Sequence, residues 1–114
     1  MNITFEKSAE ILLVSLEGRI SSVNAGQAEA DLMAQVARGE SDMLLDMSRL
    51  DYISSAGLRV VLLLAKKLKQ SGGVLVLHGM QPQIREVFDI SGFLNILTVT
   101  DTREEALVHF SHLG

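Results

Sequence analysis

A long amphipathic segment lies between two short apolar runs, and this arrangement leaves few folds open to the chain. The runs, Met43–Leu45 and Val74–His78, have the composition of strands buried on both faces of a sheet. The segment between them, Ser54–Gln70, has apolar residues at helical spacing and is followed by the pair Gly72-Gly73. A loop over Met47–Ile53 is expected before it. A strand, a helix and a second strand in this order return the chain in parallel, so the sequence predicts an α/β sheet.

The residues before this unit predict a hairpin and a first helix. Two β-prone runs, Ile3–Lys7 and Ile11–Glu17, suit an antiparallel hairpin, and Gly18 is expected to end the second run. Apolar residues then recur at helical spacing over about Asn24–Arg38, with Asn24 as the expected N-cap.

The residues after the unit predict two more helices and one more strand. A helix is expected to begin at Pro82, and a last strand to cover Asn95–Val99. Asp101 and Glu104 have the spacing of a capping box, so they are expected to begin a final helix that reaches about His112. The predicted order is ββαβαβαβα, a sheet of mostly parallel strands with an N-terminal antiparallel hairpin and helices packed on it.

Composition agrees with one globular domain over residues 1–114. The chain has 114 residues, of which 47% are hydrophobic and 21% charged, values far from those of a disordered chain. A second hydrophobic core would need more residues, because domains cluster at roughly 100–150 residues.

The same composition excludes several classes of function. A net charge of −4 and an aromatic content of 4% argue against nucleic acid as a partner, which needs clustered basic residues or stacking platforms. The absence of cysteine excludes disulfides and thiolate metal sites. The longest apolar run, Val60–Ala65, is far shorter than the roughly 20 residues that span a bilayer. With no signal-peptide pattern at the N-terminus, we expect a cytoplasmic protein without direct membrane insertion.

A projection of the long helix separates an apolar side from a basic one. The apolar side, which is expected to face the sheet, carries Leu58, Val61, Leu62, Ala65 and Leu68. Leu63 instead falls between Arg59, Lys66 and Lys67 on the polar side. An exposed leucine framed by basic residues favours a docking surface, although a single exposed leucine is common and needs no function.

Two serines stand at the start of this helix, where free backbone N–H groups and the helix dipole favour negative charge. Ser54 is the expected cap, and Ser55 is the accessible residue that could carry a phosphate. The alternative is that both serines only satisfy the helix start. Asp46, at the end of the first apolar run, suits a turn that binds the following backbone, and it could also contact a partner.

No pattern in the sequence predicts catalysis, a cofactor or a metal. Phosphate-binding loops of the GxxxxGK[ST] and GxGxxG types are absent, as is the GxSxG elbow of a serine nucleophile. His109 and His112 have the spacing of one edge of a metal site, but no third ligand lies near them in the sequence. We therefore predict that the chain is not an enzyme and that Ser55 is the substrate of one.

The stretches LLLDMSRLDYISSAGLRVVLLLAKKLKQSGG and PQIREVFDISGFLNILTVTDTREEAL resemble the STAS domain of bacterial anti-sigma factor antagonists. The most specific elements are the apolar strand that ends at Asp46 and the helix start Ser54-Ser55-Ala56-Gly57-Leu58. A weaker match is Ile90-Ser91-Gly92-Phe93. The resemblance covers nearly the whole chain and implies the STAS fold.

The resemblance also implies a partner-switching function. In that family, the unmodified antagonist binds a serine kinase that is also an anti-sigma factor, and a sigma factor is set free. The kinase phosphorylates the antagonist, and a PP2C-type phosphatase reverses the modification. The modified serine precedes the helix-start glycine by two residues, which corresponds to Ser55 because that glycine is Gly57. The family often has aspartate before this serine, and since this chain has Ser54 there, Ser54 remains an alternative site.

The residues expected to contact the partner lie mainly on the long helix. They are Asp46, Ser54, Ala56, Gly57, Arg59, Leu63, Lys66 and Lys67. A second function implied by the resemblance is that of a subunit that does not switch and docks on the ATPase of a membrane transport complex.

Overall fold

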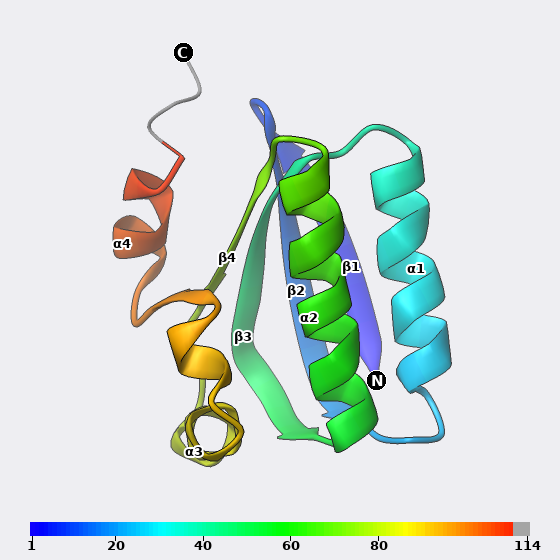
Figure 1. Ribbon diagram of the computed structural model, residues 1–114, viewed down its shortest axis with the longest axis vertical. Helices are drawn as coiled ribbons and strands as arrows, with labels where there is room; N and C mark the ends of the chain where they lie inside the picture. The colour runs from blue at the N-terminus through cyan, green and yellow to red at the C-terminus, as the bar shows by residue number, and fades with distance from the viewer. Residues whose placement is uncertain (111–114) are drawn as a thin grey trace.

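The computed structural model describes residues 1–110, which form one mixed sheet with helices on both faces (Figure 1). The strand order is β1-β2-β3-β4-β5. The strands are β1 (Asn2–Ser8), β2 (Ile11–Ile20), β3 (Asp42–Ile53), β4 (Val74–His78) and β5 (Thr98–Thr100). β1 pairs with β2 in antiparallel orientation, and every later pair is parallel. The predicted α/β architecture with an N-terminal hairpin is confirmed.

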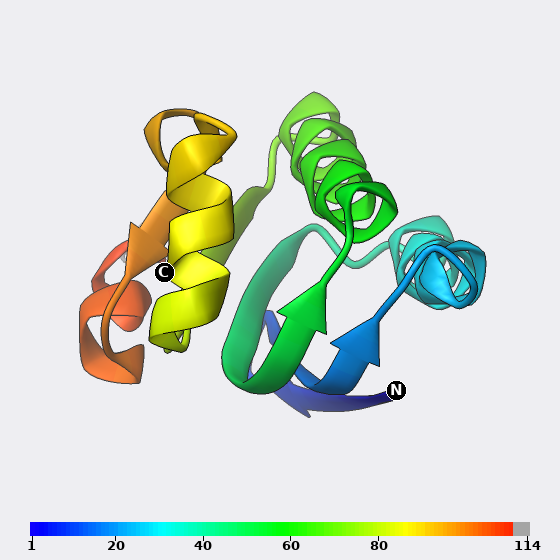
Figure 2. The same ribbon diagram turned by 90° about the horizontal axis from the view of Figure 1, so that it is seen from below.

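The helices are α1 (Ala25–Ala37), α2 (Ser55–Gln70), α3 (Pro82–Ile90), the short 3₁₀ turn η1 (Phe93–Asn95) and α4 (Arg103–Val108). The helices α1, α2 and α3 lie in the connections between consecutive parallel strands, and α4 follows the last strand. Figures 1 and 2 show α1 and α2 side by side over one face of the sheet, and α4 beside β4 at the opposite side of the molecule from α1. The end expected for the final helix, His112, lies outside the described residues.

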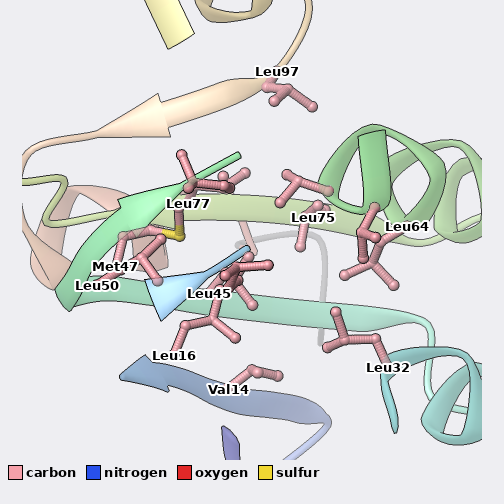
Figure 3. Packing of buried hydrophobic residues seen from close by; sticks show 14 of the residues in the cluster. Val14, Leu16, Leu32, Leu45, Met47, Leu50, Leu64, Leu75, Leu77 and Leu97 are labelled. Atoms are coloured by element: carbon pink, nitrogen blue, oxygen red, sulfur yellow. The ribbon is translucent and has the colours of Figure 1, made fainter. Parts of the chain in front are cut away.

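Alternation along the buried strands divides the core between the two faces of the sheet. Met43 and Leu45 of β3 belong to the main core, which also contains buried residues of α1, α2 and α3. Leu44 belongs to a smaller cluster with Ala106 of α4. Figure 3 shows the main core, in which Leu45 lies among leucines of the neighbouring strands and of both long helices. Because the two clusters alternate along β3, α4 covers the face of the sheet opposite to α2.

β3 is much longer than the sequence indicates, so the prediction of a loop over residues 47–53 is wrong. β3 continues through these residues to Ile53, and its second half pairs with the end of β2. The pairing shifts register twice, so Met47, Leu50 and Ile53 are buried at a spacing of three instead of two. This irregular strand places the start of α2 at the carboxyl ends of β2 and β3.

Glycine at position 18 does not end β2, contrary to the prediction. Gly18 has a φ of +88° and lies at the second register shift, where it lets the strand bend and continue to Ile20. The N-cap position of α1 is Asn24, as predicted, but its side chain does not cap the helix. Its Oδ1 instead accepts a hydrogen bond from the backbone N–H of Ser21 at 2.8 Å.

Two predictions near the C-terminus are shifted along the chain. The last strand covers Thr98–Thr100, because the residues after Gly92 form the 3₁₀ turn first. The cap of α4 is Thr102 and not Asp101: the Thr102 hydroxyl accepts from the Glu105 N–H at 3.1 Å and contacts Glu105 Oε1 at 3.0 Å. Both pairs have capping-box spacing, and the helix uses the one that begins one residue later.

Candidate functional site

The candidate site is built on the first turn of α2, and Ser54 holds this turn in place. The Ser54 hydroxyl accepts a hydrogen bond from the Gly57 backbone N–H at 3.2 Å, which confirms that Ser54 is the N-cap. Its own backbone N–H donates to the Ile20 carbonyl at 2.8 Å. The half-buried Ser54 therefore ties the helix start to the end of β2.

Close packing under the first turn also fixes its position. A Cβ atom added at Gly57 would lie 2.7 Å from Ile53 Cγ1 and 2.8 Å from Ile20 Cγ2. These distances are too short for carbon atoms, so only glycine lets α2 approach the ends of β2 and β3 this closely. Gly57 is buried and Ala56 is half-buried, so both residues offer little accessible surface to a partner.

Ser55 is the first residue of α2, and it is exposed. Among residues 1–110, its hydroxyl makes no hydrogen bond that would assign it a structural role. No acidic residue lies in the first turn of α2, so the positive end of the helix dipole is not neutralised by a carboxylate of that turn. The geometry thus gives the two serines different positions: Ser54 is engaged in the cap, and Ser55 faces solvent.

The outer face of α2 carries the expected basic residues. Arg59, Lys66 and Lys67 are all exposed. Leu63, which was predicted to be exposed, is half-buried. We define the α2 surface as the set of Ser55, Arg59, Leu63, Lys66 and Lys67, which one face of the helix brings together.

The inner face of α2 is broader than the projection predicts. Leu58, Val61 and Leu68 are buried as expected, but Val60 and Leu64 are buried as well. α1 packs beside α2 and removes an additional flank of the helix from water (Figure 2). The sequence pattern could not reveal this flank, because it does not say where the neighbouring helix lies.

Asp46 is not part of the α2 surface. It lines a hollow with Leu44 and Arg103, on the face of the sheet that α4 covers. Seven strand residues separate it from the start of α2, on the order of 20 Å at the usual rise of a strand. Asp46 Oδ1 accepts a hydrogen bond from the Ser48 N–H at 2.9 Å, so the expected bond to the following backbone is confirmed. The expected turn is not present, because Asp46 lies within β3 and the strand continues past it to Ile53.

A buried histidine lies next to Asp46, and its environment could not be inferred from the sequence. His78 ends β4 and pairs in register with Asp46. Its Nε2 lies 4.0 Å from Asp46 Oδ1 and has no hydrogen-bond partner in the described part of the chain. Burial lowers the pKa of His78, and the nearby carboxylate of Asp46 counteracts only part of this effect. Burial favours the protonated form of Asp46, but hydrogen bonding from Ser48 and the charge of Arg103 hold its pKa below the usual value.

Acid should therefore destabilise the fold through His78. A histidine whose pKa is lower in the folded state binds its proton more readily when unfolded. The stability of the fold with a neutral His78 is fully present above the ordinary histidine pKa of 6.5, and part of it is lost as the pH falls below that value. We expect the free energy of unfolding, measured by urea titration, to fall between pH 7 and pH 5, and His78→Gln to remove most of this decrease. His109→Gln is the matched control, because His109 is exposed; an equal change in both variants contradicts the assignment.

Neither a metal cluster nor a membrane-spanning helix is found in residues 1–110. No group of three or more histidine and carboxylate side chains is placed to hold a metal ion there. Within the same range, every helix is too short or too polar to cross a bilayer. His109, one of the two histidines considered as a metal edge, is exposed, and His112 lies outside the described residues.

These features define an α/β domain with a mixed five-stranded sheet, whose longest helix begins with one capping serine and one exposed serine. The model of the STAS domain family matches residues 2–106. The chain belongs to the STAS domain family.

Similar proteins carry the name of anti-sigma factor antagonist. BtrV of Bordetella bronchiseptica, which bears that name provisionally, is 54% identical over 110 residues, or 96% of this chain and 95% of the relative. The structure of an anti-sigma factor antagonist from Mycobacterium paratuberculosis matches with a TM-score of 0.85 at 23% identity, covering 95% of this chain and 92% of that one. The phosphorylated form of the Bacillus cell fate determinant SpoIIAA matches with a TM-score of 0.72 at 23% identity, covering 96% and 99%.

Proposed function

We propose that this chain is an anti-sigma factor antagonist that binds a serine-kinase anti-sigma factor through the α2 surface and is released when Ser55 is phosphorylated. The high identity to BtrV over almost the full length of both chains supports the antagonist function. The observation that carries the proposed switch is the difference between the two serines: Ser54 is bound in the cap, whereas Ser55 is exposed and its hydroxyl makes no hydrogen bond within residues 1–110. A PP2C-type phosphatase would restore the binding form, and the circuit would operate in the cytoplasm.

The position of Ser55 favours a switch that acts on the surface and leaves the fold intact. A phosphate adds a charge of about −1.5 to −2 at pH 7 together with three acceptor oxygens. At the start of α2 this charge is compatible with the helix dipole, so the helix should persist. The phosphate then opposes docking, because the partner would have to desolvate it and face its charge.

Phosphorylation by a candidate serine-kinase anti-sigma factor from the same organism tests this function. We expect ATP and the kinase to add one phosphate to the wild-type chain, located at Ser55 by mass spectrometry. Ser55→Ala should accept none. Ser54→Ala should still be modified at Ser55, although loss of the cap lowers stability by about 1 kcal/mol.

Two other outcomes of this experiment would contradict the proposal. Phosphate on Ser54 would assign the switch to the capping residue. A chain that is modified at neither serine and co-purifies with the ATPase of a membrane transport complex would have the alternative function of a subunit that does not switch.

A further inference from the structure

Ser55 and Arg59 lie one helical turn apart on the exposed side of α2. Both side chains face solvent, and residues at positions i and i+4 have Cβ atoms about 5–6 Å apart. An acidic group that lies four residues before a basic one has the more favourable of the two orders on a helix. A phosphate on Ser55 would therefore be within reach of the Arg59 guanidinium without a change in the backbone.

Arg59 has no competing carboxylate on its own helix. α2 contains Arg59 and three lysines but no aspartate or glutamate. The ion pairs found in residues 1–110 join other side chains and leave Arg59 out. Lys66, the next cation along the same side of α2, lies seven residues from Arg59, so it is out of reach of a group on Ser55.

We propose that Arg59 changes its binding partner when Ser55 is phosphorylated. In the unmodified protein Arg59 binds a carboxylate of the kinase, and in the modified protein it binds the phosphate of Ser55. This inference rests on the proposed function for the modification itself. Arginine suits both roles, because its planar guanidinium pairs with carboxylate and phosphate in two parallel hydrogen bonds.

The phosphate has two advantages over the partner's carboxylate in this competition. Its charge is nearly twice as large, and it presents three acceptor oxygens. It is also attached to the same helix, so pairing costs none of the translational and rotational freedom that a separate protein loses on binding. Phosphorylation therefore adds a negative charge and also removes the cation that holds the partner.

A chain synthesised with phosphoserine at position 55 tests the pairing without any kinase. Pairing with Arg59 stabilises the dianion, so the second pKa of the phosphate, measured by ³¹P NMR titration, should be lower in wild type than in Arg59→Gln. We expect a difference of about 0.5 units, or threefold in the dissociation constant. Arg59→Lys should keep part of the effect. Lys66→Gln removes the same charge from the same side of α2 beyond reach of the phosphate, and it should titrate like wild type.

Binding of the unmodified chain to the kinase tests the other half of the inference. Arg59→Gln should weaken binding about tenfold, and Lys66→Gln should weaken it less. Equal ³¹P titrations of wild type and Arg59→Gln would overturn the phosphate pairing, and equal kinase affinities would overturn the partner contact. Failure of the kinase to modify Ser55 would overturn the proposed function instead, because the titration does not depend on that enzyme.

Discussion

Ser55→Asp is expected to weaken binding to the serine kinase at least 100-fold, or by about 2.7 kcal/mol, and to change the unfolding temperature by no more than about 2 °C. Ser55 is exposed at the first position of α2, and its hydroxyl makes no hydrogen bond to another residue in the described part of the chain. A carboxylate there is stabilised by the helix dipole, so the fold gains or loses little. The affinity for the kinase falls because the new charge must be desolvated at the interface. The carboxylate also pairs with Arg59 in competition with the partner.

Isothermal titration calorimetry and thermal unfolding of the same samples measure the two expected effects. Ser55→Asn is the matched control, because it has nearly the shape of aspartate without the charge, and it should bind far better than Ser55→Asp. Ser55→Ala should bind the kinase like wild type, and this binding should persist when ATP is added, because the variant has no hydroxyl at position 55 to phosphorylate. A large fall in the unfolding temperature of Ser55→Asp would indicate that the charge acts on folding, and a switch that acts only on the binding surface would then be wrong.

The division of roles between the two serines was predictable in part from the sequence. The start of an amphipathic helix identifies a cap, and projection of the helix places Ser54 nearer the buried side and Ser55 nearer Arg59. The structure confirms that Ser54 accepts from the Gly57 N–H and that Ser55 is exposed. Local signals were sufficient here, because a helix cap is decided by residues within one turn of each other.

The second half of β3 was not predictable from such local signals. Its polar residues resemble those of a loop, and its buried residues recur at a spacing of three, which is typical of neither a strand nor a helix. The spacing results from two register shifts against β2, a strand that lies about thirty residues earlier in the chain. Local signals could not place Asp46 either. It is close to Ser55 in the sequence, but it lies on the face of the sheet that α4 covers, opposite to α2.

A substitution at the other end of α2 is expected to have a large effect on the free energy of unfolding. Gly73 there packs closely against the backbone just before β3. A Cβ atom added at Gly73 would collide with the backbone carbonyl of Ser41. That carbonyl accepts a hydrogen bond from the Val74 N–H at 3.1 Å, and Val74 is the first residue of β4. The Gly73 N–H itself donates to the Leu68 carbonyl at 2.7 Å. Neither backbone segment can move aside without breaking hydrogen bonds that join α2, β3 and β4.

Gly73→Ala should therefore lower the free energy of unfolding by about 3–4 kcal/mol, and the unfolding temperature by about 10–20 °C. Gly26→Ala is the control, because a Cβ atom there meets nothing within 4 Å, and alanine in helix α1 should leave stability unchanged or raise it slightly. Urea and thermal unfolding measure both variants. The close approach lies at the end of α2 opposite to Ser55, so folded Gly73→Ala should bind the kinase with wild-type affinity. A variant as stable as wild type would contradict the close approach, and a stable variant that fails to bind would show that the two ends of α2 are coupled.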